Sequence, residues 1–268
     1  MIQGNVAILG GGKIGEAIVS GLVRGPLAPD RLQVVERYPD RARYLQQKYG
    51  VRSVEIAAAF AFADTVVLAV KPQDVGALLA QIRPHVAGRH LILSVLAGVT
   101  TATLEAGLPD SVAVVRCMPN TPALVDEAMT AISAGTWAEE THLATAEAML
   151  SAVGQVVRVP EEQLDAVTAL SGSGPAYFFY LVEAMIDGGI LLGLPRALAA
   201  QLIIQTAVGS ARMLHDTGEH PVQLREAVTS PGGTTIAAIR ELENHGVRAA
   251  MLAAMEAAYR RSKELGGQ

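Results

Sequence analysis

Two short segments of this chain combine residue types that bind charged ligands. The first, Val6–Gly15 (VAILGGGKIG), places Gly10, Gly12 and Gly15 at the spacing G-x-G-x-x-G. In a strand-to-helix turn the first glycine permits the sharp bend, the second leaves room for a pyrophosphate, and the third lets helix and strand pack closely. A helix that starts near Lys13 would point free N–H groups and the positive end of its dipole at the phosphates. The segment therefore predicts a dinucleotide site rather than a turn without a ligand.

The second segment, Val228–Thr235 (VTSPGGTT), lies far along the chain and suits a small anion. Its Pro-Gly-Gly forms a turn, and the two threonines that follow open a helix whose exposed N–H groups can bind a carboxylate. The glycines let a ligand approach the backbone, and the serine hydroxyl can add a hydrogen bond. The residues alone fit a simple helix cap somewhat better, since Ser and Thr are favoured caps. As substrate ligands the segment offers Ser230, Gly232, Gly233, Thr234 and Thr235. A nucleotide site and an anion site together indicate a redox enzyme acting on a small acid.

The end of the second expected strand bears on the choice of coenzyme. Glu36 could accept hydrogen bonds from the ribose hydroxyls of NAD, whereas Arg37, with Arg41 one turn away, could pair with the 2′-phosphate of NADP. These opposite charges leave both NADH and NADPH open, with NADPH marginally favoured.

Composition argues against several classes of function. The chain has 268 residues and a formal net charge of -5, with its basic residues scattered, so we expect no nucleic-acid partner. The single cysteine, Cys117, fits a reducing compartment and is expected to be a buried apolar residue. The six histidines show no metal-ligand spacing, and we expect no metal. No signal peptide and no membrane span are expected, which predicts a cytoplasmic protein.

Hydrophobic patterning predicts two domains. Residues 1–160 alternate short apolar runs with helical patterns, which is typical of a doubly wound α/β sheet of the Rossmann type, whose later strands could run antiparallel. Strands are expected at Val6–Leu9, Leu32–Val35, Thr65–Val70, Leu91–Val95, Val112–Arg116, Met129–Ser133 and Gln155–Val159. Helices are expected at Ile14–Arg24, Asp40–Tyr49, from Pro72 onward and at Glu139–Val153.

Residues 161–268 show no strand pattern and are expected to form an all-helical domain. Helices are expected within Glu161–Gly193, from Pro195 to about Asp216, and at His220–Val228, Thr235–His245 and Val247–Leu265. The apolar surplus within Ala184–Leu194 exceeds what one helical layer can bury, so we expect an oligomer interface, with a helix buried on all sides within the chain as the alternative. The small residues of Ser171–Pro175 are expected to let two helices cross rather than to hold a phosphate, and His220 is expected to cap a helix or lie on the surface.

Further motifs complete a family pattern. They are Ala69–Pro72 (AVKP), Arg116–Pro122 (RCMPNTP) and Leu170–Tyr177 (LSGSGPAY). With the two segments above, in this order and over essentially the whole chain, they closely resemble the pyrroline-5-carboxylate reductase family. The Ser-Pro-Gly-Gly-Thr-Thr run is the most specific part and the glycine-rich turn the least.

The resemblance implies an activity and an assembly. The first domain should bind NADPH or NADH. The helical domain should form an interlocked homodimer, which in the family often assembles into a homodecamer. The active site should lie between the cofactor domain and helical segments, including those of the partner subunit. The reaction should transfer hydride from the nicotinamide to the C=N carbon of 1-pyrroline-5-carboxylate and yield L-proline, the last step of proline biosynthesis.

The resemblance also assigns residues. Thr235 should be catalytic and hydrogen-bond the ring nitrogen of the substrate, where a donor would stabilise developing charge. Glu161 should contact the substrate, although an acidic residue there also stabilises a helix start. Lys71 should line the coenzyme, although a solvated surface lysine is the alternative. Coenzyme contacts are expected from Leu9, Gly10, Gly11, Gly12, Lys13, Ile14, Gly15, Glu36, Arg37, Val70, Lys71, Pro72, Ala97, Met118, Pro119 and Asn120.

Two departures and two alternative functions stay open. Many family members carry Asn-Arg or Ser-rich sequences where this chain has Glu36-Arg37, and a glutamate that some members carry before the His220-Pro221 pair has no counterpart here. One alternative is another small NAD(P)-dependent imine or 3-hydroxyacid oxidoreductase. The absence of a lysine in the helical region Glu161–Gly193 argues against the 3-hydroxyacid class. The other is a catalytically silent NAD(P)-sensing protein, against which Ser230 and Thr235 argue.

Overall fold

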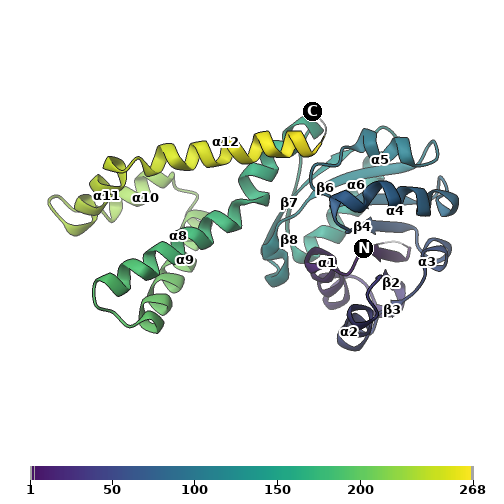
Figure 1. Cartoon of the computed structure of the whole chain (residues 1–268), viewed down its shortest axis with the longest axis horizontal. Coiled ribbons are helices and arrows are strands. Elements are labelled where there is room, and N and C mark those ends of the chain that lie inside the picture. The colour runs from purple at the N-terminus through teal and green to yellow at the C-terminus, as the bar shows by residue number, and fades with distance from the viewer. Residues whose placement is uncertain (1, 3, 267–268) are drawn as a thin grey trace. The chain divides into compact units, whose positions relative to one another are not determined.

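The computed structural model describes residue 2 and residues 4–266. It divides into two compact units, Met1–Ser173 with Ala258–Gln268, and Gly174–Ala257. Figure 1 labels the elements of each. This division follows packing within the chain, and the boundary expected after Pro160 stays a prediction of where the functional domains meet.

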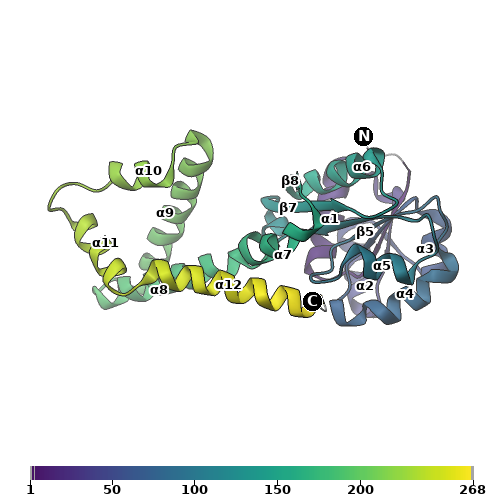
Figure 2. The same ribbon diagram turned by 90° about the horizontal axis from the view of Figure 1, so that it is seen from above.

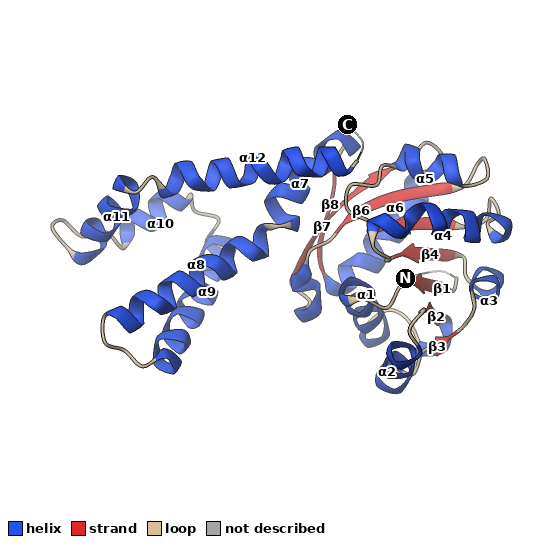
Figure 3. Ribbon diagram, viewed as in Figure 1, coloured by secondary structure: helices blue, strands red, loops and turns tan. Residues whose placement is uncertain are grey.

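A single eight-stranded sheet organises the first unit, in the order β3-β2-β1-β4-β5-β6-β7-β8 (Figure 3). The strands are β1 (Val6–Leu9), β2 (Leu32–Val35), β3 (Arg52–Ser53), β4 (Thr65–Leu68), β5 (Leu91–Ser94), β6 (Ala113–Met118), β7 (Ala128–Ala134) and β8 (Gly154–Arg158). Strands β1 to β6 pair in parallel, whereas β7 runs antiparallel to β6 and β8 runs parallel to β7. The predicted doubly wound sheet with reversed late strands is confirmed.

Helices cover both faces of this sheet. They are α1 (Lys13–Arg24), α2 (Pro39–Tyr49), α3 (Ile56–Phe62), α4 (Val75–Ile82), α5 (Thr101–Gly107) and α6 (Glu140–Leu150). Helices α1, α2 and α6 supply side chains to one apolar cluster, and α3, α4 and α5 supply them to the other. Figure 2 shows α6 on one side of the sheet and α4 and α5 on the other. Strands β1, β4 and β5 are buried along their whole length, which explains their continuous apolar runs.

The sequence prediction missed three short elements. The seven expected strands are all present, with ends within two residues of those expected, but β3 was missed because two residues carry no periodicity. Helices α3 and α5 were also missed. Each has seven residues, fewer than two helical turns, and a run as short as Ile56–Phe62 shows no usable apolar period.

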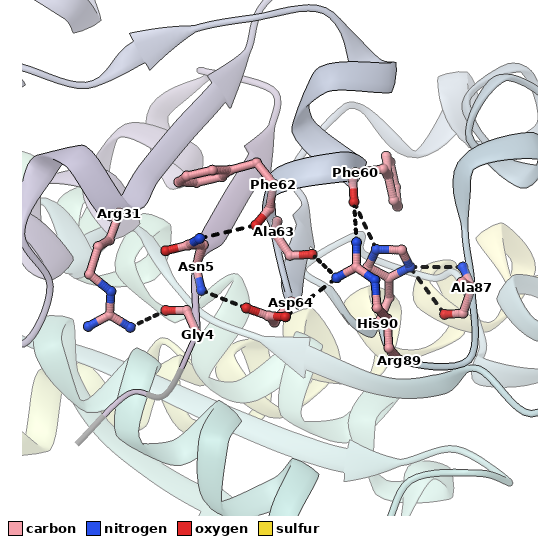
Figure 4. A network of polar contacts seen from close by, with 10 residues as sticks. All are labelled: Gly4, Asn5, Arg31, Phe60, Phe62, Ala63, Asp64, Ala87, Arg89 and His90. Atoms are coloured by element: carbon pink, nitrogen blue, oxygen red, sulfur yellow. Dashed lines mark hydrogen bonds and ion pairs between the residues drawn. The ribbon is translucent and has the colours of Figure 1, made fainter.

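A polar network fixes the amino-terminal ends of the central strands (Figure 4). The N–H of Asn5, just before β1, donates to Asp64 Oδ2 at 2.9 Å, just before β4. His90, just before β5, accepts the Ala87 N–H at Nδ1 over 2.8 Å, so its Nε2 carries the proton and donates to Phe60 O at 3.0 Å. Burial lowers the pKa of His90 and favours this neutral form. The Asn5–Asp64 bond thus joins the starts of β1 and β4, and His90 ties the start of β5 to α3 and to the preceding loop.

The second unit is helical. Its elements are α8 (Gly174–Leu191), α9 (Arg196–Thr217), α10 (Pro221–Ala227), α11 (Thr234–Asn244) and the first part of α12 (Val247–Leu265), whose last residues belong to the first unit. The expected run of helices is confirmed, and the described residues after β8 contain no strand. His220 caps α10, where its Nδ1 accepts the Val222 N–H at 3.3 Å, as expected.

The Ser171–Pro175 segment begins inside a π-helical turn, Thr168–Gly172, which follows a short helix, α7 (Leu164–Val167). Within one chain, Gly172 permits a close approach to a side chain at the end of a strand. A Cβ on Gly172 would lie 2.6 Å from the Met118 side chain at the end of β6. The expected crossing of two helices at this segment stays a prediction.

One described helix, α9, is long and apolar enough to cross a membrane by length and composition, a test that core helices of other proteins also pass. Several of its large side chains, including Leu202, Ile204 and Val208, are more than half exposed within this single chain.

Glu16 on α1 accepts hydrogen bonds from four side chains of α2. Part of the free energy of unfolding should therefore be lost in acid. Burial raises its pKa, but hydrogen bonds from Arg41, Tyr49, Lys48 and Tyr44 outweigh burial and lower the pKa to about 2. The ionised form is therefore favoured by folding. This stabilisation is fully present above the ordinary pKa of a glutamate and is lost as the pH falls toward 2.

We expect Glu16→Gln to lower the free energy of unfolding by about 1 to 2 kcal/mol at pH 7. Urea denaturation at pH 7, 4 and 3 should show the two proteins converging as the pH falls. Glu264→Gln, which breaks only an exposed pair with Arg261, is the control and should change little at any pH. A difference for Glu16→Gln that is constant from pH 7 to pH 3 would contradict this account.

Candidate active site

The glycine-rich turn joins β1 to α1 in the conformation that a dinucleotide requires. Gly10 has φ +107°, and a Cβ on it would lie 2.5 Å from Ala69 O. A Cβ on Gly15 would lie 2.0 Å from Gly10 O, so helix and turn can touch only because this residue is a glycine. A Cβ on Gly12 would meet no atom within 4 Å. The turn is thus tightly packed on its inner side and open at Gly12.

The start of α1 supplies donors at that open side. Gly12 is the N-cap residue of α1, and no side chain caps the helix. The first N–H groups of a helix have no partner within the helix, and together with the dipole they attract phosphate. Room at Gly12 and uncapped donors beside it fit the pyrophosphate of a dinucleotide.

The other predicted coenzyme residues lie at the same edge of the sheet. Strands β1, β2, β4, β5 and β6 are parallel, so their carboxyl-terminal ends share one edge, where ligands bind in this architecture. The predicted coenzyme residues end these strands or come soon after them. They are Leu9 and Ile14 for β1 and α1, Glu36 and Arg37 after β2, Val70, Lys71 and Pro72 after β4, Ala97 after β5, and Met118, Pro119 and Asn120 at or just after the end of β6. The topology thus brings together residues that are as far apart as 9 and 120 in the sequence.

Glu36 turns its carboxylate toward the glycine-rich turn. Its Oε2 accepts the Gly11 N–H at 2.7 Å, and its Oε1 accepts the Tyr38 N–H at 2.9 Å. Arg41 donates to Gly11 O at 2.6 Å and also pairs with Glu16. Arg37 is exposed and donates to the Tyr38 hydroxyl at 2.7 Å.

Two of the predicted coenzyme residues after β4 and β6 differ in their surroundings. Lys71 is exposed and sits at the N-cap of a short 3-10 turn. Asn120 is buried, and its side chain joins Ser171 O at 3.1 Å to the Met129 N–H at 3.0 Å. The Asn120 amide therefore joins the segment after β6 to β7 and to Ser171.

Glu161 belongs to a buried ionic network in the first unit that the sequence prediction missed. Its Oε1 accepts the Thr101 N–H at 2.7 Å and a bond from Arg116 at 3.1 Å, and its Oε2 accepts the Thr101 hydroxyl. Burial raises the pKa of Glu161, but these hydrogen bonds and the Arg116 charge outweigh it and lower the pKa. Arg116 also lies 3.9 Å from Asp165, which accepts the Ser262 hydroxyl at 2.6 Å.

The signal for this network was present in the sequence. Arg116 interrupts an otherwise apolar strand, Ala113–Met118, and its side chain is only 4% exposed. A buried guanidinium needs acidic partners, so Arg116 itself pointed to a pair of carboxylates. The sequence did not say which carboxylates these are.

The Ser230–Thr235 segment lies in the second unit and has the predicted local form. Gly233 N–H donates to Ser230 O at 3.1 Å, which closes the turn, and Gly232 has φ +67°. A Cβ on Gly233 would lie 2.3 Å from Ser230 Oγ, so glycine lets the serine hydroxyl lie over the start of α11. No side chain caps α11, and Thr235 on its first turn is half-buried. The segment thus presents uncapped N–H groups and two threonines, the arrangement predicted for a carboxylate.

Two further observations bear on the chemistry. Cys117 is buried, and burial raises its pKa, so its thiol is kept in the unreactive protonated form. Within the described part of the chain, no group of three or more His, Cys, Asp or Glu side chains is placed to hold a metal ion.

Comparison with known proteins connects both units to one family. Residues 161–265 match the model described as pyrroline-5-carboxylate reductase dimerisation, and residues 5–98 match that described as NADP oxidoreductase, coenzyme F420-dependent. The pyrroline-5-carboxylate reductase of Synechocystis sp. is 48% identical over 97% of this chain and 98% of its own. That of Mycobacterium tuberculosis is 46% identical over 97% and 96%.

Solved structures agree with these relatives. A pyrroline-5-carboxylate reductase from Coxiella burnetii superposes with a TM-score of 0.91 at 38% identity over 98% of both chains. The pyrroline carboxylate reductase of Plasmodium falciparum, solved with NADP bound, gives a TM-score of 0.90 at 27% identity over 99% of both chains. A glycine-rich coenzyme turn, a helical dimerisation domain and close similarity along nearly the whole length place this chain in the pyrroline-5-carboxylate reductase family.

Proposed function

We propose that this protein reduces 1-pyrroline-5-carboxylate to L-proline with NADH or NADPH, the last step of proline biosynthesis. The observation that carries the proposal is the coexistence, in a member of this family, of an open glycine-rich turn at Gly12 and an uncapped helix start at Thr234. The first fits the phosphates of a dinucleotide, and the second fits the carboxylate of a small acid.

The carboxyl edge of the sheet would hold the coenzyme. The turn Gly10–Gly15 and α1 would bind the pyrophosphate, and Glu36 and Arg37 would lie at the adenosine ribose. We assign the contacts closer to the nicotinamide to the segments after β4, β5 and β6. When bound, the reduced nicotinamide supplies the hydride.

The Ser230–Thr235 segment would hold the substrate. The free N–H groups at the start of α11 and the Ser230 hydroxyl are suited to the substrate carboxylate, and Gly232 and Gly233 permit its approach. Thr235 would donate its hydroxyl hydrogen bond to the ring nitrogen. As hydride reaches the C=N carbon, the electron pair of the C=N π bond moves to that nitrogen, so a donor aimed there stabilises the developing amine.

A proton must also reach the ring nitrogen, and a threonine hydroxyl is too weak an acid to supply it alone. We propose two routes for this proton. A neutral imine accepts the Thr235 hydrogen bond and takes its proton from water, whereas a protonated imine donates its N–H to the Thr235 oxygen, and its nitrogen gains a lone pair only as hydride arrives. Glu161 is the proposed second substrate contact. The lowered pKa keeps Glu161 ionised, and a carboxylate attracts the cationic form of the imine.

The matched dimerisation domain supports an oligomer, and we propose a homodimer that assembles further into a homodecamer. A second copy would cover the apolar side chains of α8 and α9 that are exposed in one chain. We propose a cytoplasmic location and no nucleic-acid or membrane partner, consistent with the net charge of -5.

The direct test is an assay with both coenzymes. Purified protein is mixed with 1-pyrroline-5-carboxylate and either NADH or NADPH, and loss of the reduced-nicotinamide absorbance is followed while L-proline is quantified. We expect proline to form in equal amount to the coenzyme oxidised. Coenzyme binding without any turnover would favour the NAD(P)-sensing alternative, and turnover of 3-hydroxyacids or other imines alone would favour another oxidoreductase.

A further inference from the structure

The carboxylate of Glu36 is fixed at the position that reads the adenosine ribose. Glu36 directly follows β2, and its two oxygens accept the N–H groups of Gly11 at 2.7 Å and Tyr38 at 2.9 Å. The side chain is half-buried, and a carboxylate oxygen can accept more than one hydrogen bond. Both oxygens can therefore accept further hydrogen bonds without leaving their backbone partners.

We propose that Glu36 makes this protein selective for NADH over NADPH, an inference that rests on the proposed binding of the coenzyme at the glycine-rich turn. The 2′- and 3′-hydroxyls of the NADH ribose can each donate to the carboxylate. The 2′-phosphate of NADPH has replaced one of these donors and carries negative charge, so it meets a like charge that the backbone holds in place.

The two neighbouring arginines, Arg41 and Arg37, are already engaged with other groups of the protein. Arg41 is engaged with Gly11 O at 2.6 Å and in its ion pair with Glu16, so its guanidinium is committed to the packing of α2 against the turn. Arg37 donates to the Tyr38 hydroxyl at 2.7 Å, and its guanidinium carbon lies 5.0 Å from the Tyr38 ring centre. Arg37 would have to leave both contacts to pair with a phosphate, whereas Glu36 needs no movement to meet a ribose. This geometry reverses the marginal preference for NADPH that the sequence predicts.

Equilibrium binding tests the proposal without any catalytic turnover. The whole protein is titrated with NADH and with NADPH in the absence of imine, and binding is followed by calorimetry and by nicotinamide fluorescence. We expect the wild-type protein to bind NADH at least about tenfold more tightly than NADPH. Glu36→Ser should weaken NADH and strengthen NADPH, and so shift the ratio of the two dissociation constants by at least about tenfold toward NADPH.

Asp40→Ser is the matched control, because Asp40 is a neighbouring carboxylate that is 92% exposed. It should leave the ratio of the two dissociation constants within about twofold of wild type. Arg37→Ser combined with Glu36→Ser should remove much of the gain for NADPH, because Arg37 is the cation directly beside Glu36 that can pair with the phosphate. Thermal unfolding of each variant checks that it folds.

Three results would overturn the proposal. Wild-type protein that binds NADPH as tightly as NADH, or a folded Glu36→Ser variant with an unchanged ratio, would remove Glu36 from coenzyme selection while leaving the proposed reductase function intact. Failure of the wild-type protein to bind either coenzyme would overturn the proposed function together with this inference.

Discussion

Thr235→Ala is expected to lower kcat by about 10- to 1000-fold while leaving the dissociation constant of the coenzyme nearly unchanged. Thr235 is the residue we assign to the substrate nitrogen, and the loss of one donor aimed at developing charge costs this much in other enzymes. The coenzyme is expected to bind at the glycine-rich turn, which belongs to the other unit of the chain, so its affinity should not depend on this hydroxyl. Steady-state kinetics and coenzyme titration measure the two quantities separately.

Two companion variants separate chemistry from structure. Thr235→Ser keeps the hydroxyl and should retain most of the turnover, whereas Thr235→Val keeps the shape without the hydroxyl and should resemble the alanine variant. Thr234→Ala removes the neighbouring, exposed threonine and should affect kcat much less. An alanine variant at Thr235 with wild-type kcat would exclude its hydroxyl from the mechanism.

Arg116→Met is expected to reduce the free energy of unfolding by about 3 to 5 kcal/mol, because it leaves two carboxylates without their buried cation. Arg116 lies 3.1 Å from Glu161 and 3.9 Å from Asp165, and its side chain is 4% exposed. In the variant the pKa of Glu161 should rise, since the Arg116 hydrogen bond and charge help to lower it. Urea denaturation followed by the fluorescence of Trp137, the single tryptophan, reports on the unit that contains this network.

Arg158→Met is the matched control. Arg158 also pairs with two carboxylates, Glu140 at 2.7 Å and Glu147 at 2.6 Å, but its side chain is 36% exposed. Solvated ion pairs contribute little to stability, so this variant should unfold close to wild type. Equal losses for the two variants would mean that burial does not decide the strength of these pairs.

The sequence predicted the elements that have a recognisable apolar run or a helical apolar pattern. Continuous apolar runs such as Val6–Leu9 marked the buried parallel strands, and Pro160 marked the end of the strand pattern. What it missed was short or depended on distant partners. The two-residue strand β3 forms by pairing with β2, and no local property of Arg52 and Ser53 predicts that pairing.

The candidate site divides in the same way. The glycine-rich turn and the Ser230–Thr235 segment are local, and the positive φ angles of Gly10 and Gly232 are ones that glycine adopts without strain. The role of Glu36 depends on which neighbour its carboxylate meets, and the sequence offered only two opposite charges side by side. Tertiary packing adds what the sequence could not show, which is that the Glu36 carboxylate lies 2.7 Å from the Gly11 N–H.

A crystal structure of the protein with NADH and L-proline tests the central claim most directly, because two reduced ligands cannot react and the complex persists. The account predicts that the proline carboxylate lies on the N–H groups at the start of α11 and that the ring nitrogen lies about 3 Å from the Thr235 hydroxyl. It also predicts that the nicotinamide faces the ring carbon that is bonded to the nitrogen and does not carry the carboxylate. Proline bound away from the Ser230–Thr235 segment, or NADH bound away from the glycine-rich turn, would contradict it.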